Sequence, residues 1–165
     1  MRVARLAKRQ YAHLLDGRGA AIAGGRWNSK GKAVTYTASC GALAVVEYLA
    51  HISTLPRGLM LTVIEIPDTL AIERVHSIPA DPLAFLRIGD DWLDSKSSPV
   101  LEVPSVLVPR QVNYLINPEH TLVGAIRVIE SNPLRSIAGF CRQSRRLETS
   151  KTDPEIKGTI ASRKR

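Results

Sequence analysis

The five residues GGRWN, at positions 24–28, combine side chains suited to binding an anionic group. The two glycines let the backbone approach a ligand closely, and the planar guanidinium of Arg26 matches a phosphate or carboxylate through paired hydrogen bonds. The segment is not a Walker phosphate loop, because that loop ends in Gly-Lys-Ser/Thr and residues 29–31 here read Ser-Lys-Gly. Taken alone, a Gly-Gly-Arg sequence is more often an ordinary turn.

Three other polar residues stand in apolar surroundings. Glu47 falls inside an apolar helical segment, where a carboxylate is either a rim residue that reaches solvent or a half-buried group with a chemical role. By default Tyr36 is a packing aromatic with its hydroxyl at the surface, and Ser105 is a strand serine bonded to the backbone. A serine-hydrolase site is not indicated, because Pro104 and Val106 flank this serine where a nucleophile elbow has glycines.

The elements that must carry these residues follow from periodicity. Residues 4–15 have a loose helical spacing of apolar side chains before Asp-Gly, which predicts a short helix. Residues 33–38 (AVTYTA) are rich in β-branched and aromatic side chains and predict a strand. Ser39 is a suitable N-cap for a helix over residues 40–52. The apolar stripe of this helix, which we expect to be buried, consists of Ala42, Val45, Val46, Leu49 and Ile52.

The remaining segments mix strand and helix signals without a repeat. The predicted strands cover residues 59–67 in the interior of a sheet, 70–75, 100–109 and 122–130. We expect a helical piece around Trp92 (88–95), a turn opened by Asp81-Pro82, and a turn over 113–118 in which Asn113 and Asn117 bond to the backbone. Pro104 and Pro109 favour an edge or a bulge for the strand over 100–109. Because no regular βαβ repeat appears, the sequence predicts an α+β fold in one compact domain.

Composition limits the classes of protein that fit. The chain has 165 residues, of which 44% are hydrophobic and 23% charged, values typical of a globular domain. No apolar run is long enough to span a bilayer and the basic start lacks the apolar stretch of a signal peptide, so we expect a cytoplasmic protein with no membrane partner. Cys40, Cys141 and the four scattered histidines have no metal-ligand spacing, so no metal site is expected.

The charge is concentrated at the two ends. The net charge is +8, which leaves a basic nucleic-acid-binding module as an alternative to an enzyme, although aromatic residues are few at 5% and no nucleic-acid motif is present. Residues 1–32 hold eight Lys and Arg against Asp16 alone. Residues 141–165 hold eight against three acidic residues and lack an apolar face, so we predict a flexible basic tail that is dispensable for chemistry.

Together these segments resemble the RES domain. The stretch GGRWNSKGKAVTYTASCGALAVVEYLAH is very similar to the core of that family, with Arg26, Tyr36 and Glu47 at the matching positions. IGDDWL, VPSVLVP with Ser105, and NYLINPEH continue the family's order, so the resemblance covers roughly residues 3–130. The segment after Glu130 departs from the family's aromatic-Asp-Arg closing strand. We therefore predict a RES domain over residues 1–140 and the basic tail beyond it.

The resemblance implies a fold similar to ADP-ribosyltransferases of the diphtheria-toxin kind and a toxin that consumes NAD by cleaving its nicotinamide–ribose bond. It implies catalytic roles for Arg26, Tyr36, Glu47 and Ser105, and NAD binding by Arg5, Gly25, Arg26 and Tyr36. Hydrolysis, phosphorolysis and ADP-ribosylation of a protein all remain open as the reaction. The implied partner is an Xre-family antitoxin, with DNA reached only through that antitoxin. The oligomeric state also stays open, a homo-oligomer included.

Overall fold

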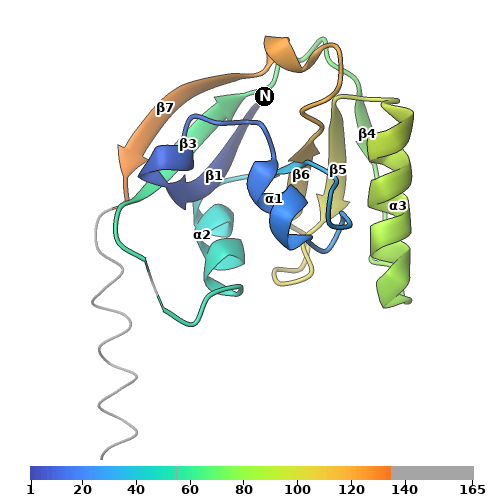
Figure 1. The fold of residues 1–165 in the computed structure, drawn as a ribbon, viewed down its shortest axis with the longest axis horizontal. Coiled ribbons are helices and arrows are strands. Elements are labelled where there is room, and N and C mark those ends of the chain that lie inside the picture. Colours follow the sequence, from blue (N-terminus) through green and yellow to red (C-terminus); the bar gives the residue numbers. More distant parts are fainter. Residues whose placement is uncertain (55, 135–165) are drawn as a thin grey trace, which may run out of the picture. The chain divides into compact units, whose positions relative to one another are not determined.

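The computed structural model describes residues 1–54 and 56–134 (Figure 1). The predicted domain boundary at residue 140 and the predicted tail over 141–165 lie outside the described residues. Met1–Leu134 form one compact unit of mixed strands and helices, which confirms the α+β class. The strands are β1 Arg2–Lys8, β2 Thr35–Ala38, β3 Leu59–Glu65, β4 Ile72–Arg74, β5 Val100–Pro104, β6 Val112–Ile116 and β7 Arg127–Pro133. The helices are α1 Arg18–Ala23, α2 Gly41–Leu49 and α3 Pro82–Ser95, with the 3-10 turns η1 Arg9–Tyr11 and η2 Val123–Ala125.

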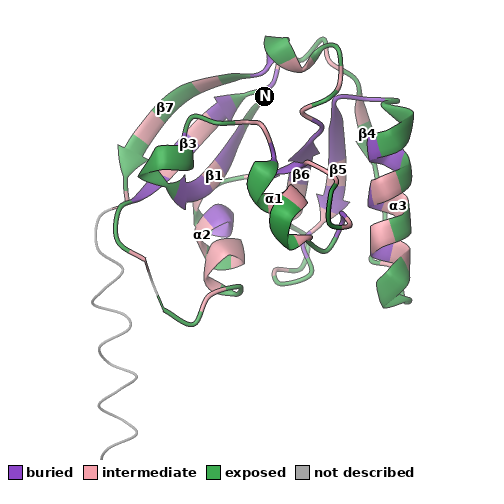
Figure 2. Ribbon diagram, viewed as in Figure 1, coloured by how far each residue is buried: buried purple, intermediate pink, exposed green. Residues whose placement is uncertain are grey.

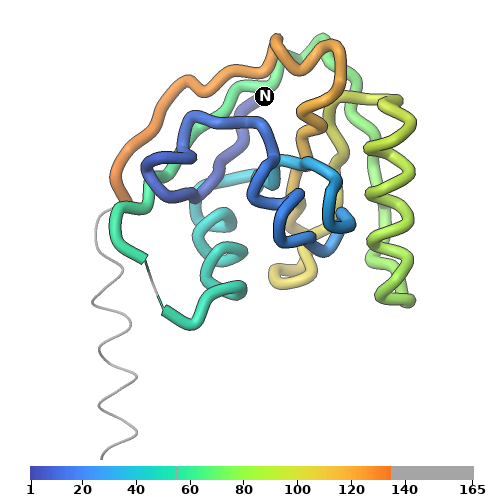
Figure 3. The backbone as a smooth tube through the Cα atoms, viewed as in Figure 1, coloured from blue at the N-terminus to red at the C-terminus, as the bar shows by residue number. Residues whose placement is uncertain are grey.

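All seven strands form one sheet in the order β4-β5-β6-β2-β1-β3-β7. Only β4 and β5 run parallel among these pairs, and the others are antiparallel. The ladder between β3 and β7 shifts register at Ile129, which is an extra residue on β7. The described chain ends beside the start of β3, where the amide of Leu134 donates to the carbonyl of Leu59 (Figure 3).

Register assigns the side chains to the two faces of the sheet. Ala4 pairs with Ala38, Ala38 with Asn113 and Tyr36 with Leu115, so all five side chains point to the same face. The helices α2 and α3 cover this face, and their buried residues form two core clusters with it (Figure 2). The first cluster contains Trp27, Val34, Phe85, Trp92, Leu93, Leu101, Val103 and Leu115, and the second contains Ala4, Ala38, Leu43 and Ala44. The opposite face has its own cluster, Val3, Ile64, Ile66, Val100, Tyr114, Ile116 and Ile126.

The predicted helix over residues 4–15 is wrong, because residues 2–8 form the strand β1. Ala and Leu favour a helix intrinsically, but both sides of β1 are hydrogen-bonded, to β2 and to β3. This pairing outweighs the local preference. Ser39 is also not the N-cap of α2: Cys40 holds that position without a side-chain cap, and the Ser39 hydroxyl contacts Gln111 instead.

Several segments in the second half also differ from expectation. The strand that contains Pro104 is not at an edge of the sheet, because β5 lies between β4 and β6; this proline is its last residue. Residues 113–118 are not a turn, since most of them belong to β6. Helix α3 is longer than predicted and begins at Pro82, after Asp81 caps it by accepting from the Leu83 amide. The predicted interior strand β3, the short strand β4 and the strand β2 are confirmed.

Candidate functional site

Helix α2 turns Glu47 toward the sheet. Its buried residues are Leu43 and Ala44, and Glu47 lies four residues after Leu43, one turn further along the same face. The predicted buried stripe is therefore wrong, and Val46 from that stripe is 44% exposed. The helix is apolar nearly all round, so its sequence does not select a face. As a result Glu47 is half-buried against the strands instead of standing at a solvent rim.

Two side chains hold the Glu47 carboxylate. The Ser105 hydroxyl donates to Glu47 Oε1 at 2.7 Å, and the Asn113 side-chain amide donates to the same oxygen at 2.7 Å. Ser105 is 3% exposed, and its Oγ also accepts from the backbone amides of Leu107 and Val108. These two amides occupy the acceptor side of the hydroxyl, so its hydrogen is committed to Glu47. Of the predicted site residues, Glu47 and Ser105 are thus brought into direct contact.

The Tyr36 hydroxyl anchors the GGRWN loop. Its Oη accepts from the Trp27 amide at 3.0 Å and donates to Asn28 Oδ1 at 2.8 Å. Burial raises the pKa of Tyr36 to about 12, an effect opposed by the hydrogen bond from the Trp27 backbone. The phenol is therefore neutral at physiological pH, and both bonding positions of its oxygen are used within the protein.

Asn28 organises the same loop from inside. It is 0% exposed, and its side-chain amide contacts the carbonyl oxygens of Ala20, Ser29 and Lys32 at 2.9, 3.2 and 2.9 Å. A buried amide with these partners fixes the path of the backbone around it. The loop is consequently preorganised by its own Asn28 before any ligand arrives.

Gly25 lies where a side chain has no room. A Cβ at this position would stand 2.5 Å from Tyr36 Oη and 2.6 Å from Asn28 Oδ1. Gly24, with φ of +73°, supplies the left-handed conformation that begins the turn. The two glycines are therefore required by the packing of the loop itself, whatever the loop binds.

Arg26 is the charged residue of the loop, and it is exposed. Its guanidinium carbon lies 5.4 Å from the centroid of the buried Phe85 ring, a cation–π distance. The Phe85 ring meets Trp27 edge to face, with centroids 4.9 Å apart. Because the cation rests on an aromatic ring, its five N–H donors stay available to a ligand in solvent.

Helix α3 supports the loop from behind. The Ser29 amide donates to Asp90 Oδ1 at 2.9 Å, and Lys32 forms an ion pair with Asp94. The hydrogen bond with Asp94 raises the pKa of Lys32. The loop that carries Arg26 is therefore attached to α3 by two separate contacts.

The tyrosine and the glutamate group are neighbours on one sheet face. Tyr36 lies two residues before Ala38 on β2, and Ala38 is paired with Asn113 on β6. The side chains of Tyr36 and Asn113 are therefore diagonal neighbours, about 7–8 Å apart. Asn113 in turn binds Glu47. The register thus places the GGRWN loop and the carboxylate next to each other around β2 and β6.

Arg5 is not part of either group. Side chains alternate along β1, so Arg5 points to the face opposite that of Ala4. Its guanidinium donates to the carbonyl oxygen of Leu14, and burial lowers its pKa, partly offset by the Asp16 charge. The structure gives Arg5 a bond to the segment between η1 and α1.

Three residues that position the site were missed in the sequence. Asn28 is the last letter of the GGRWN motif, and its polar side chain next to Trp27 was the available signal. Asn113 was expected to bond to a turn backbone; it binds Glu47 instead, whereas Asn117 does bond to the backbone, at Leu93 and Glu119. Asp90 gave no signal, because its partner is 61 residues away in the chain.

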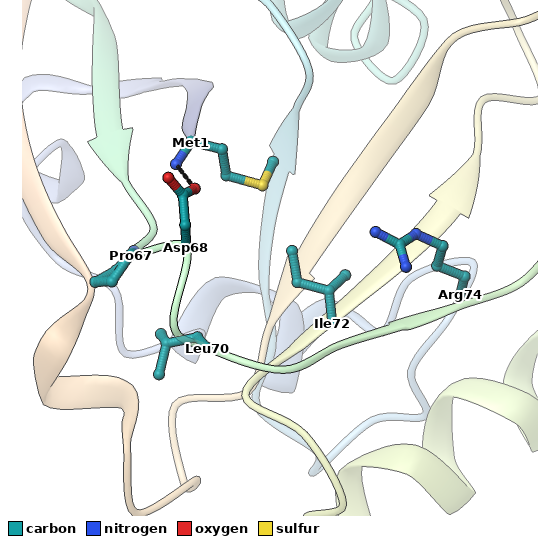
Figure 4. A pocket seen from close by; sticks show the side chains of 6 residues that line it. All are labelled: Met1, Pro67, Asp68, Leu70, Ile72 and Arg74. Carbon is teal, nitrogen blue, oxygen red and sulfur yellow. Dashed lines mark hydrogen bonds and ion pairs between the residues drawn. The ribbon is translucent and has the colours of Figure 1, made fainter.

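A pocket of about 370 Å³ lies elsewhere, at the start of the segment that leads into β4. Figure 4 shows its lining, with the amino group of Met1 paired to Asp68. The remaining lining residues are Pro67, Leu70, Ile72 and Arg74. None of the predicted site residues lines this pocket.

The described part of the chain has neither a cluster of metal-binding side chains nor a membrane-spanning helix. No group of three or more His, Cys, Asp or Glu side chains in residues 1–54 and 56–134 is placed to hold a metal ion. No helix in the same residues is long and apolar enough to cross a membrane.

Comparisons with known proteins agree on one family. A family model described as RES domain matches residues 1–137. The Prs ADP-ribosylating toxin of Sphingobium sp. is 39% identical in an alignment of 131 residues, with coverage of 72% of this chain and 81% of that protein. The Toxin Res of Yersinia enterocolitica is 41% identical in an alignment of 131 residues, with coverage of 73% of this chain and 86% of that protein.

A solved structure shares the fold. A chain in the crystal structure of the M. tuberculosis MbcT-MbcA toxin-antitoxin complex superposes with a TM-score of 0.66 at 20% identity. The match covers 81% of this chain and 83% of the other. The residues matched by the family model include the Arg26 loop, Tyr36, Glu47 and Asn113. This chain belongs to the RES domain family.

Proposed function

We propose that this protein is the toxin of a toxin–antitoxin pair and that it consumes NAD by cleaving the nicotinamide–ribose bond. The observation that carries the proposal is the Glu47 carboxylate, half-buried on the sheet face and held by Ser105 and Asn113. Relatives that are 39% and 41% identical are named as toxins, one of them as an ADP-ribosylating toxin. ADP-ribosylation uses NAD, so these names support NAD as the substrate.

Cleavage of the nicotinamide–ribose bond is favoured by a carboxylate next to the ribose carbon that loses nicotinamide. When the C1′–N bond breaks, its electron pair leaves with nicotinamide and positive charge develops on the ribose. A fixed carboxylate next to that carbon stabilises the cation without having to reorganise, and the half-buried setting strengthens the interaction. Glu47 is the acidic residue of the described site that is turned toward the sheet, and it fills this role.

The loop supplies the binding contacts. Arg26 offers a bidentate fork for the pyrophosphate, and Gly25 lets the backbone approach the ligand. Tyr36 uses its hydroxyl to hold Trp27 and Asn28, so its contribution to binding comes from the ring, by stacking. NAD binding by Arg5 remains our prediction from the sequence; its guanidinium donates to the carbonyl oxygen of Leu14.

The acceptor distinguishes three outcomes of the same bond cleavage. Water gives nicotinamide and ADP-ribose, inorganic phosphate gives nicotinamide and ADP-ribose 1″-phosphate, and a protein side chain gives nicotinamide and a modified protein. The name of the Sphingobium relative favours the third outcome as a second candidate function. Each step releases the proton of the acceptor and consumes no oxidant or reductant.

The partner we propose is an antitoxin. The fold neighbour was solved within a toxin-antitoxin complex, which supports a protein that covers this toxin. An Xre-family antitoxin, with DNA contacted only through it, remains our prediction from the sequence. Electrostatic nucleic-acid binding by the +8 chain is the competing possibility, and it would weaken steeply as salt rises.

The test is a product assay. Purified full-length protein is incubated with NAD, with and without phosphate and with a cell extract, and the products are identified by mass spectrometry. We expect loss of NAD, and a fall of about 100-fold or more in Glu47→Gln, which keeps the shape of the side chain and removes its charge. Glu65→Gln, at the exposed end of β3, is the matched control and should be unchanged. Full activity in Glu47→Gln, or intact NAD with the wild type, contradicts the proposal.

A further inference from the structure

Two donors converge on one oxygen of the Glu47 carboxylate. Ser105 Oγ and Asn113 Nδ2 both bond to Oε1 at 2.7 Å, from the loop after β5 and from the second residue of β6. Within residues 1–54 and 56–134, no donor bonds to the second oxygen, Oε2. The carboxylate is thus held at one end, and its other oxygen keeps its lone pairs for a different partner.

The hydrogen bond from Asn113 to Glu47 leaves the other end of the Asn113 amide without a partner. Its Oδ1 is buried and has no hydrogen-bond partner in the described part of the chain, and such an orphan acceptor is unfavourable. Rotating the amide by half a turn would place Oδ1 against the Glu47 carboxylate, two acceptors facing each other. The bond to Glu47 therefore fixes the observed orientation of the Asn113 side-chain amide.

We propose that Asn113 is a positioning residue for the NAD-cleaving reaction, an inference that rests on the proposed function. Together with Ser105 it holds Oε1 so that Oε2 faces the ribose carbon as the C1′–N bond breaks. The electron pair of that bond leaves with nicotinamide, Oε2 stabilises the resulting cation, and the acceptor then adds at the same carbon. Asn113 touches neither substrate nor acceptor and acts only through the orientation of Glu47.

The inference predicts a specific kinetic signature. Asn113→Ala should leave the KM for NAD within about threefold and lower kcat by roughly 10- to 100-fold, because a misaligned carboxylate loses transition-state contact. A residue needed only for packing would instead reduce the folded fraction and leave the turnover of the folded molecules unchanged.

The isosteric variant Asn113→Asp supplies a second readout. It places another carboxylate against Glu47, and two like charges at this distance make one of them bind a proton more readily. The acid limb of the pH–rate profile should therefore move to higher pH in Asn113→Asp. An unmoved limb would mean that residue 113 does not lie against the carboxylate on which the reaction depends.

The experiment measures kcat, KM, the pH–rate profile and the thermal melt of the full chain. The matched control is Asn132→Ala on β7, because Asn132 also donates to a glutamate, Glu130, but at an exposed position; it should match the wild type. If Asn113→Ala loses its cooperative melt, the acid limb of the pH–rate profile of Asn113→Asp tests the proposal instead. Wild-type turnover together with unchanged kcat in a folded Asn113→Ala, or an unmoved acid limb in Asn113→Asp, overturns this role alone. A wild type that leaves NAD intact overturns the proposed function and this role with it.

Discussion

Gly89 of helix α3 lies against the backbone of Trp27: a Cβ at this glycine would stand 1.8 Å from the Trp27 carbonyl oxygen. No atom of a side chain fits in that space, so the helix and the GGRWN loop touch backbone to backbone. The next residue of α3, Asp90, accepts from the Ser29 amide on the same loop. The glycine and the aspartate together determine how closely the loop approaches α3.

Replacing Gly89 by alanine should therefore displace the loop. We expect Gly89→Ala to lower the free energy of unfolding by about 1–3 kcal/mol, as overpacking of a tight contact does, and to weaken NAD binding because Arg26 moves with the loop. Urea unfolding and isothermal titration calorimetry measure the two effects. Gly19→Ala in α1 is the control, since a Cβ there meets open space. Unaltered stability and NAD affinity in Gly89→Ala would show that α3 and the Trp27 backbone can move apart without loss of stability or binding.

Arg26 should act through the geometry of its guanidinium. We expect Arg26→Ala to weaken NAD binding by roughly tenfold or more, and Arg26→Lys to recover little, because a point charge cannot reproduce a two-pronged contact. Titration of each variant with NAD gives the affinities. Arg18→Ala removes another exposed arginine of the same region, one paired with Asp16, and should bind NAD as the wild type does. Wild-type affinity in Arg26→Ala would exclude the pyrophosphate contact.

Tyr36 should make stability sensitive to alkaline pH. Its folded pKa is raised by burial to about 12 from the ordinary value of 10.0, so the unfolded chain loses this proton first. The contribution is fully present below pH 10 and is lost as the pH rises toward 12. Between these values the wild type should lose on the order of 2 kcal/mol more unfolding free energy than Tyr36→Phe does.

Urea unfolding of both proteins from pH 8 to the alkaline limit of reversibility, on the order of pH 11, gives the comparison. At neutral pH Tyr36→Phe should be about 1–3 kcal/mol less stable, because the Trp27 amide and Asn28 Oδ1 lose their partner. Parallel pH dependence of the two proteins would mean that the Tyr36 hydroxyl is not buried in solution.

The sequence predicted those elements whose residue types agree with their surroundings. Residues 59–67 are apolar and β-branched and do lie in the sheet interior, and the helix around Glu47 and the strand around Tyr36 are confirmed. The helix predicted over residues 4–15 is wrong, because strand pairing on both sides of β1 outweighs the helical preference of Ala and Leu. The local sequence pattern of residues 4–15 does not show which strands will pair with this segment.

The site was predictable only in part for a related reason. Glu47 and Ser105 were selected as site residues, and they are in contact. The third partner, Asn113, was expected in a turn. It reaches Glu47 because β6 pairs with β2, where Asn113 lies opposite Ala38, and no local sequence motif indicates that pairing. The face on which Glu47 lies was likewise set by the strands, since α2 is apolar nearly all round.

The pairing of β2 with β6 also bears on when the protein becomes active during its own synthesis. Asn113 follows Glu47 by 66 residues, and the two meet only after β6 has been added beside β2. A nascent chain that has emerged only as far as α3 has its glutamate but no strand to hold the carboxylate. The proposed NAD-cleaving group can therefore assemble only after β6 has left the ribosome and paired with β2, well after Glu47 itself has emerged.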